Sequence, residues 1–280
     1  MSRGLTGRPA WHEIADRVFV RRYPVLDVNT TLVLGDEAAL VVDTLSTPSQ
    51  ARELVDDIRR ITPHPWLVVN THHHFDHTYG NQVFAEQPGC AIWAHSAAAD
   101  RIRAMTERTL GEIHDAYADS EPELAAEVLD VEITAPNCTV ADAATLSLSG
   151  RKVELRYLGP GHTAGDLVVC VPDADVVIAG DLIEEGGPPT FEDAFPLEWP
   201  HTVERLLQLV TGPVVPGHGA VVDRDFVAAQ HEELSRLAWL IRESHADGAD
   251  PRKVASQAPF GRATALVAVT RGYAELAGRL

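Results

Sequence analysis

The chain has few cysteines and no long apolar run. Its three cysteines, Cys90, Cys138 and Cys170, are odd in number and far apart, so they cannot all pair within the chain. This usage is typical of a reducing compartment and predicts a cytoplasmic protein. No stretch reaches the roughly 20 apolar residues that cross a bilayer. The first 25 residues, which include Arg3 and Arg8, lack the apolar segment of a signal peptide. We therefore expect no membrane partner.

Positive charge is also scarce. The 280 residues include 23 lysines and arginines against 41 aspartates and glutamates, for a formal net charge of −18. Affinity for nucleic acid depends on cationic side chains that neutralise phosphates, and no Lys/Arg-rich run is present. We expect no nucleic-acid partner. Hydrophobic residues make up 45% and charged residues 23% of the chain, which is typical of a globular protein rather than a disordered or fibrous one.

Short β-branched runs alternate with amphipathic stretches. The strands predicted from them cover residues 18–23, 30–34, 39–43, 66–70, 91–94, 145–148, 153–158, 167–171, 176–179 and 213–215. The predicted helices cover residues 47–61, 96–131, 201–210 and 226–280. Groups of strands separated by helices predict an α/β fold in which sheets pack between helical layers.

Two apolar faces mark the C-terminal helical region. The first consists of Phe226, Leu234, Leu237 and Ile241. The second is a stripe formed by Leu266, Val269, Tyr273, Leu276 and Leu280. Steps of three and four are the spacing of a helix-packing seam, which leaves packing within the chain and a homodimer as alternatives. We expect residues 1–224 to form the main domain and residues 225–280 to form a helical extension packed on it.

The most informative motif is Thr71-His72-His73-His74-Phe75-Asp76-His77. In an extended backbone His72 and His74 point to the same side, and a turn brings Asp76 and His77 back toward them. Neutral imidazole and carboxylate are ligands suited to zinc, iron or manganese. Four candidate ligands within six positions indicate a metal site rather than scattered histidines.

Three further candidates follow predicted strands. His162 lies in Gly-His-Thr, Asp181 in Gly-Asp and His218 in Gly-His-Gly. In sheets packed between helices, functional side chains gather at one end of the strands, so these positions can converge with the histidine motif. The complete set of candidate metal ligands is His72, His74, Asp76, His77, His162, Asp181 and His218. Seven ligands are too many for one tetrahedral ion and favour two ions that share a bridging group.

In order and spacing, these motifs closely resemble those of the metallo-β-lactamase fold superfamily over about residues 18–220. The resemblance implies a four-layered αββα sandwich of two mixed β-sheets flanked by helices, with a dinuclear site at one edge. It further implies that Asp181 bridges two ions, the first held by His72, His74 and His162 and the second by Asp76, His77 and His218.

Position 181 separates branches of this superfamily. Classical zinc β-lactamases have a cysteine there or lack some of the early histidines, whereas this chain, with Asp181, resembles glyoxalase II, lactonases and related hydrolases. The resemblance also implies that Asp43 supports the metal-binding loops. Asp166 either orients a ligand or belongs to a solvated turn. We expect His73 to face away from the ligands and His95 to be structural.

The resemblance implies a dinuclear metal-dependent hydrolase. A metal-bridging hydroxide would attack an ester, thioester, lactone or amide carbonyl of a small-molecule acyl substrate, with Asp76 helping to place the nucleophile. Two divalent ions are expected, zinc first and iron or manganese as alternatives. Residues 186–195 either line the mouth of the site or form a surface loop, and residues 105–117 either form a lid or only pack.

Other functions remain open. A β-lactam-hydrolysing enzyme is one, since some lactamases have a serine at position 181 or a full set of histidines. An iron-dependent oxidoreductase similar to persulfide dioxygenase is another, although such an enzyme leaves its second site incomplete. A non-catalytic binding protein would be expected to have lost ligands, and this chain has lost none.

Overall fold

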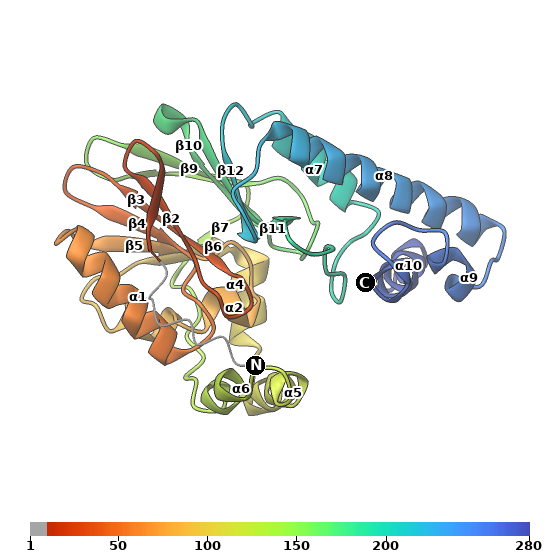
Figure 1. Ribbon diagram of the computed structural model, residues 1–280, viewed down its shortest axis with the longest axis horizontal. Helices are drawn as coiled ribbons and strands as arrows, with labels where there is room; N and C mark the ends of the chain where they lie inside the picture. Colours follow the sequence, from red (N-terminus) through yellow and green to blue (C-terminus); the bar gives the residue numbers. More distant parts are fainter. Residues whose placement is uncertain (1–9) are drawn as a thin grey trace.

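The computed structural model describes residues 10–280, within which two mixed β-sheets pack face to face between helices (Figure 1). The first sheet contains, in spatial order, β1 (His12–Ala15), β2 (Val18–Arg22), β3 (Asn29–Leu34), β4 (Ala39–Val42), β5 (Trp66–Val69), β6 (Ile92–His95) and β7 (Cys138–Val140). The second contains β12 (Val214–His218), β11 (Val176–Glu184), β10 (Leu167–Val171), β9 (Lys152–Tyr157) and β8 (Ala143–Ser147). The expectations about Arg3, Arg8 and the start of the main domain lie outside the described residues.

Both sheets mix parallel and antiparallel pairs. Neighbours from β1 to β4 are antiparallel, and neighbours from β4 to β7 are parallel. In the second sheet β8 to β11 are antiparallel, whereas β11 and β12 are parallel. The helices are α1 (Pro48–Ile61), α2 (Phe75–Thr78), α3 (Asn81–Ala85), α4 (Ser96–Arg103), α5 (Glu107–Tyr117), α6 (Pro122–Val128), α7 (Trp199–Leu207), α8 (Arg224–Ala246), α9 (Pro251–Ala255) and α10 (Arg262–Leu276), with a 3₁₀ turn at Pro172–Ala174.

Three buried apolar clusters separate the layers. Val33 and Val42 of the first sheet pack against Leu155 and Val169 of the second, so this cluster lies between the sheets. Because side chains alternate along a strand, the opposite face of the first sheet packs against α1. The outer face of the second sheet packs against α7 and α8. This arrangement confirms the predicted αββα sandwich.

Helix α1 shows how local sequence signals produce an outer layer. The Thr47 hydroxyl accepts a hydrogen bond from the backbone N–H of Gln50, and Pro48 occupies the first turn, where no N–H is needed. Leu54 and Ile58 are fully buried against the sheet. The prediction of a helix over residues 47–61 is therefore confirmed to within one residue.

Strand β11 departs from the sequence prediction. It does not end before Asp181 but continues to Glu184, so Asp181 lies within the strand. The pairing with β12 shifts register on both sides of Gly180, whose φ is +54°. A Cβ at Gly180 would lie 2.7 Å from the Cβ of Thr71. A glycine therefore allows the strand to bend close to the histidine motif and continue.

Two other features of the structure differ from the sequence prediction. Strands β1 and β7 are short edge elements with little apolar character, which is why neither produced a clear periodic signal. The stretch over residues 96–131 is not one helical segment but contains α4, α5 and α6. A capping box between Thr106 and Thr109 begins α5, and Pro122 occupies the first turn of α6.

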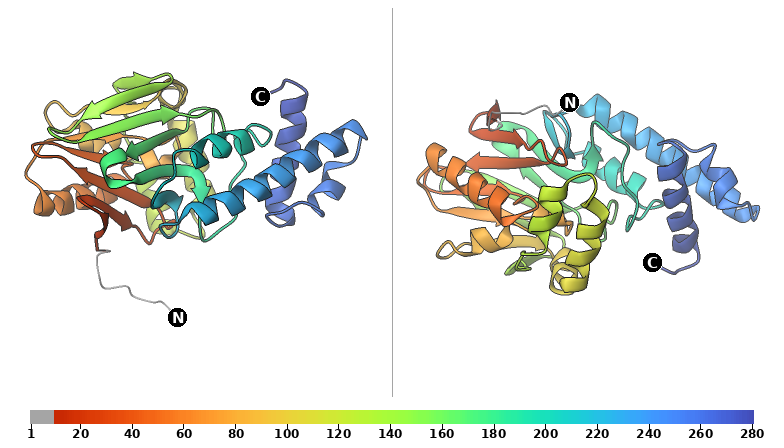
Figure 2. Two further views of the ribbon diagram at one scale, coloured as in Figure 1. Left: turned by 90° about the horizontal axis from the view of Figure 1, so that it is seen from above. Right: turned by 60° about the horizontal axis from the view of Figure 1, so that its bottom comes forward.

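The C-terminal helices extend beyond the end of the sandwich (Figure 2). Leu234, Leu237 and Ile241 of α8 are buried in the same cluster as β11, as the sequence predicts. In α10 the buried residues are Ala265, Ala268, Val269 and Gly272. The predicted stripe is therefore the packing seam only in part: Val269 is buried and Tyr273 packs against the same cluster, whereas Leu276 and Leu280 at its end are exposed. Small residues face α8 because the two helices cross closely: a Cβ at Gly272 would lie 2.7 Å from Cγ2 of Ile241.

Among the described residues, no helix has both the length and the apolar character needed to cross a membrane.

Candidate metal centre

The predicted metal ligands converge at one edge of the two sheets. They are His72, His74, Asp76, His77, His162, Asp181 and His218. The first four come from the turn after β5 and from the short helix α2, and the fifth comes from the turn after β9. The last two lie on the neighbouring strands β11 and β12. Segments more than 140 residues apart in the chain therefore meet in one place.

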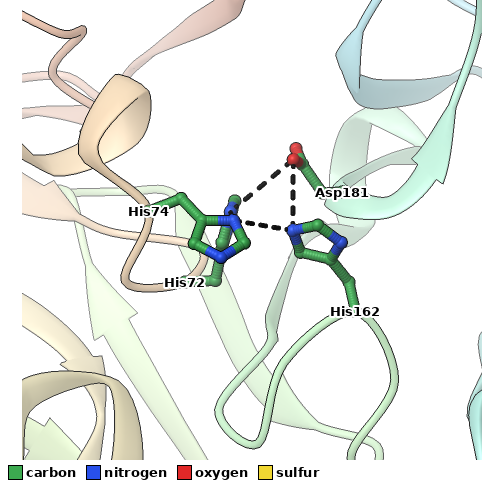
Figure 3. A group of neighbouring side chains, drawn as sticks. All are labelled: His72, His74, His162 and Asp181. Carbon is green, nitrogen blue, oxygen red and sulfur yellow. Dashed lines mark hydrogen bonds and ion pairs between the residues drawn. The ribbon is translucent and has the colours of Figure 1, made fainter. Parts of the chain in front are cut away.

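The first cluster brings three ring nitrogens to one point (Figure 3). Nδ1 of His74 lies 3.0 Å from Nε2 of His72 and 2.8 Å from Nε2 of His162. Oδ2 of Asp181 lies 3.6 Å from the His72 nitrogen and 3.4 Å from the His162 nitrogen. One carboxylate oxygen and three nitrogens thus form a compact four-atom group.

The second cluster lies on the other side of Asp181. Nε2 of His77 and Nε2 of His218 are 3.4 Å apart, and Oδ2 of Asp76 lies 3.6 Å and 3.4 Å from them, respectively. Oδ1 of Asp181 lies 3.2 Å from the His77 nitrogen, and its Oδ2 lies 3.3 Å from the His218 nitrogen. The Asp181 carboxylate therefore borders both clusters.

The spacing and the donor set fit divalent ions. Zinc–nitrogen bonds of about 2.0–2.1 Å in a tetrahedron place the ligand atoms about 3.3 Å apart, and the distances in the first cluster run from 2.8 to 3.6 Å. Oδ1 of Asp181 is buried yet accepts no hydrogen bond from any described residue. Buried acceptors normally have a partner, and a cation between the clusters would supply one.

The histidines of the centre differ in charge. Burial opposes a charge on His218, but the carboxylates of Asp181 and Asp76 outweigh it and raise the pKa of His218 to about 10. Burial lowers the pKa of His162 to about 3, so this ring is neutral at pH 7. Burial also opposes ionisation of Asp181, but the surrounding rings, His77 first, hold its pKa well below the usual range. The centre therefore holds a carboxylate already ionised for a cation.

Asp43 holds two residues of the histidine motif in place through hydrogen bonds, as predicted. Its Oδ2 accepts hydrogen bonds from Nδ1 of His77 at 2.9 Å and from the Thr71 hydroxyl at 2.7 Å, and its Oδ1 accepts the Thr71 N–H at 2.8 Å. The side chain is buried, and its backbone adopts a φ of +65° at the end of β4. Asp43 thus fixes both the His77 ring and the backbone that begins the histidine motif.

Asp166 holds the turn that carries His162. Its carboxylate accepts the N–H and the hydroxyl hydrogen of Thr163, at 2.9 Å and 2.6 Å. Burial raises the pKa of Asp166 to about 7. The structure therefore decides between the two alternatives for Asp166, because the residue is buried within the turn rather than solvated.

His95 is structural, as predicted. Its Nδ1 accepts the N–H of Ala97 at the start of α4, and its Nε2 lies 3.0 Å from the carbonyl oxygen of Ala141. The ring stacks on Tyr157 with a centroid distance of 4.0 Å. These contacts use both ring nitrogens away from the metal centre.

His73 turns away from the clusters, as predicted, but it has a partner that the sequence did not indicate. Its Nε2 lies 2.9 Å from Oδ2 of Asp193, whose Oδ1 lies 3.0 Å from Nε2 of His74. Asp193 belongs to the segment of residues 185–198 that joins β11 to α7. No spacing or flanking motif marked it, since an aspartate in a loop is common.

Glu184 is a second residue that the sequence did not indicate. Its Oε1 lies 3.7 Å from Nδ1 of His162 and accepts the backbone N–H of Thr190 at 3.2 Å. Burial, together with the charge of Asp181, raises the pKa of Glu184 to about 8. The only available signal was its position three residues after Asp181, on a strand that was predicted to end earlier.

Two adjoining cavities open beside the clusters. The larger, of about 640 Å³, is lined by Asp76, Asp181 and His218 and by the apolar side chains of Leu26, Phe75 and Tyr117, among others. The smaller, of about 420 Å³, is lined by Phe75, Met105, Ile113, Arg101 and Asp193, among others. Both include residues of α5 and of the 185–198 segment. These two stretches therefore form walls of the cavities, which agrees with the alternative that residues 186–195 line the mouth of the site. A lid formed by residues 105–117 stays a prediction.

Comparisons with known proteins agree with this architecture. A family profile described as the Metallo-beta-lactamase superfamily matches residues 23–218. The human protein named acyl-coenzyme A thioesterase MBLAC2 is 28% identical, with 75% of this chain and 77% of that protein covered. A hydroxyacylglutathione hydrolase of Synechococcus sp. (strain JA-3-3Ab) is 25% identical over 68% of this chain, which spans only 63% of that relative.

The structural comparison concerns the fold alone. A metallo-beta-lactamase from Pontibacter korlensis superposes with a TM-score of 0.63 at 22% sequence identity, covering 81% of this chain and 99% of that one. The family profile and the hydrolases named above confirm the predicted resemblance and the predicted class of metal-dependent hydrolase. The family and the two clusters imply divalent metal ions.

Proposed function

Because this chain belongs to the metallo-β-lactamase superfamily, we propose that it is a dinuclear hydrolase of small acyl compounds, with a thioester as the first candidate substrate. The observation that carries this proposal is the position of Asp181, whose two carboxylate oxygens lie within 3.6 Å of histidine nitrogens in both clusters. A carboxylate shared between two three-residue groups is an arrangement suited to two ions about 3.5–4 Å apart.

In this proposal each ion has its own set of side chains. One would be held by His72, His74 and His162 and the other by Asp76, His77 and His218, with Asp181 between them. When bound, two divalent ions lower the pKa of an attacking water to about 7 and polarise the carbonyl under attack. Zinc is the first candidate, and iron or manganese are the alternatives.

The chain itself would orient the reactants. Asp76 lines the larger cavity with its Oδ2 inside the second cluster, so its carboxylate can orient the attacking water. Phe75 and Tyr117 form an apolar wall of the same cavity, which would exclude water from an acyl chain placed there. A volume of about 640 Å³ lies within the range of about 300–1,000 Å³ for small-molecule sites.

Three observations favour a thioester hydrolase over the alternatives. The similar curated relatives include thioesterases and hydroxyacylglutathione hydrolases from several organisms, and also a metallo-beta-lactamase of Bacillus cereus. An aspartate rather than a cysteine stands at position 181, which favours the hydrolase branch over the classical β-lactamases. The second cluster has all three of its residues, which favours two ions over the single iron of a persulfide dioxygenase.

A metal analysis combined with a hydrolysis screen tests the proposal. The purified protein is expected to contain two zinc ions per chain and to cleave thioesters faster than lactones, β-lactams or phosphoesters. His74→Ala and Asp181→Ala should lose hydrolysis together with bound metal. His201→Ala, a control at an exposed histidine outside the clusters, should keep both. Full activity in either of the first two variants would contradict the proposal, as would one iron per chain.

Location and oligomeric state stay predictions. All three cysteines are free thiols, which supports the proposal of a cytoplasmic protein. The exposed Leu276 and Leu280 support the alternative of a homodimer formed through the end of α10. A molar mass of 30.4 kDa, that of one chain, measured by light scattering would contradict the dimer.

A further inference from the structure

The 185–198 segment places one carboxylate against two adjacent histidine rings. Oδ1 of Asp193 lies 3.0 Å from Nε2 of His74, and Oδ2 lies 2.9 Å from Nε2 of His73. The side chain of Asp193 is partly buried, and it lines the smaller cavity. Asp193 is not one of the seven candidate ligands, so its contact with the outer nitrogen of His74 requires a separate explanation.

The contact determines which nitrogen of His74 carries a proton. An ionised carboxylate only accepts hydrogen bonds, and a neutral imidazole has one N–H and one free lone pair. When the ring is neutral and donates its Nε2–H to Asp193, Nδ1 of His74 is left unprotonated. Nδ1 is the nitrogen that faces Nε2 of His72 and Nε2 of His162 in the first cluster.

We propose that Asp193 is a positioning residue that fixes the tautomer and the ring orientation of His74 for metal binding in the first cluster. The inference rests on the proposed two-metal function. Metal-bound histidines commonly donate their other N–H to a carboxylate, and losing that partner weakens metal binding about 10- to 100-fold. His73 holds Oδ2 and thereby aims Oδ1 at His74.

The same contact joins the substrate wall to the metal centre. Glu192, next to Asp193, lines both cavities, and Thr190 of the same segment donates its N–H to Glu184 beside His162. The segment is therefore attached to the first cluster at two histidines, His74 and His162. A displacement of this wall would move the ring of His74 with it.

A third ion between His73, His74 and Asp193 is the competing explanation. The three residues can be grouped as ligands, but here each ring faces a carboxylate oxygen at 2.9 or 3.0 Å, which is an ordinary hydrogen-bond length, whereas in the first cluster three ring nitrogens face one another. Each carboxylate oxygen serves one ring, which accounts for both contacts without a cation. The experiment separates the two explanations by counting ions.

The test measures zinc affinity and histidine tautomers rather than activity. Asp193→Asn preserves size but places an amide that can donate a hydrogen bond against one of the two rings. We expect zinc affinity at the first cluster, measured by competition with a chromogenic chelator, to fall about 10- to 100-fold. ¹⁵N NMR of the metal-free protein, at a pH high enough for the His74 ring to be neutral, should show this ring losing its single Nε2–H tautomer. Glu198→Gln, at an exposed residue of the same segment, should change neither measurement.

A double-mutant comparison shows whether His73 acts through Asp193. His73→Gln should weaken zinc binding less than Asp193→Ala, and it should add nothing in the background of Asp193→Ala. Thermal unfolding of the metal-free variants verifies that each one folds.

The outcomes are distinguishable. Unchanged zinc affinity and tautomer in Asp193→Asn overturn the inference while leaving the proposed function intact. If the wild-type protein binds three ions and Asp193→Asn loses only one of them, Asp193 is a metal ligand and not a positioning residue. This result also overturns the inference. A wild-type protein that binds no divalent ion overturns this inference together with the proposed function.

Discussion

Oδ2 of Asp43 lies 2.9 Å from Nδ1 of His77, so the buried carboxylate determines that Nε2 of His77 faces the second cluster. In the wild-type protein Oδ2 of Asp43 accepts hydrogen bonds from both the His77 ring and the Thr71 hydroxyl. Asp43→Asn removes the negative charge and leaves a single side-chain oxygen as acceptor. We expect zinc affinity at the second cluster to fall about 10- to 100-fold, measured by chelator competition. Asp115→Asn, at an exposed aspartate that pairs with His114, is the control and should bind zinc as the wild type does.

Zinc binding should release protons and depend on pH. The pKa of His218 is raised from 6.5 to about 10, so this ring is protonated at pH 7 in the metal-free protein and must lose the proton to bind an ion. Release of the His218 proton alone should increase the affinity of the second cluster by about tenfold per pH unit between pH 7 and pH 9. Burial opposes a charge on His77, but the nearby carboxylates also raise its pKa well above the usual value, which adds to this dependence. Calorimetric titrations in two buffers of different ionisation enthalpy measure the release, and affinity that does not vary with pH would contradict it.

The raised pKa of His218 also makes the stability of the metal-free protein depend on pH. Metal affinity is expected to increase with pH, whereas this contribution to stability decreases. The folded state binds the His218 proton more tightly than the unfolded state. The resulting stabilisation is fully present below pH 6.5 and disappears as the pH rises through about 10. Metal-free protein should therefore lose the contribution of His218 between these values, and His218→Ala should lack that part of the pH dependence. Denaturant titrations across this range measure the difference.

Gly180→Ala should destabilise the protein and disturb the centre. The residue has a φ of +54°, and its Cβ would lie 2.7 Å from the Cβ of Thr71. The left-handed backbone alone costs about 1–2 kcal/mol for a residue other than glycine, and relief of the contact must move Thr71 or Asp181. Thermal unfolding and zinc stoichiometry measure the two effects. The control is Gly187→Ala, whose added Cβ would have no atom outside the neighbouring residues within 4 Å. This variant should change stability by less than about 0.5 kcal/mol.

Gly272→Leu should separate α10 from α8. The Cβ would lie 2.7 Å from Cγ2 of the buried Ile241, and overpacking of this kind costs about 1–3 kcal/mol. The loss is measured as a lower free energy of unfolding in denaturant. The matched substitution Gly111→Leu lies in α5 with no atom within 4 Å and should not destabilise. Equal effects in the two variants would show that the crossing of α8 and α10 is not tightly packed.

The sequence predicted those parts of the centre that are encoded locally. His72, His74, Asp76 and His77 lie within six positions, and no tertiary information is needed to recognise them as a group. The apolar strands and the cap of α1 were likewise readable, because hydrophobic periodicity and capping are short-range signals. The resemblance to the metallo-β-lactamase superfamily in the order of the motifs then assigned the distant His162, Asp181 and His218 to the same site as the histidine motif.

What the sequence could not predict depends on contacts across the fold. Asp193 acquires its role only because the 185–198 segment passes beside His74, and a loop aspartate has no distinguishing pattern. The end of β11 was misplaced because Gly180 was interpreted as a turn, whereas the strand bends there and continues. The packing face of α10 was predicted only in part: Val269 and Tyr273 do pack against the core, but no signal in the sequence indicated that the close helix crossing selects small residues such as Ala268 and Gly272.

The distance along the chain between the members of each cluster has a consequence for biosynthesis. His77 and His218 are 141 positions apart, so the histidine motif emerges from the ribosome long before either Asp181 or His218 exists. Every residue of the first cluster has been translated once Asp181 is made, whereas the second cluster lacks one of its residues until His218 follows. In the proposed two-metal protein, the second ion would therefore be bound tightly only after β12 has been translated and has paired with β11.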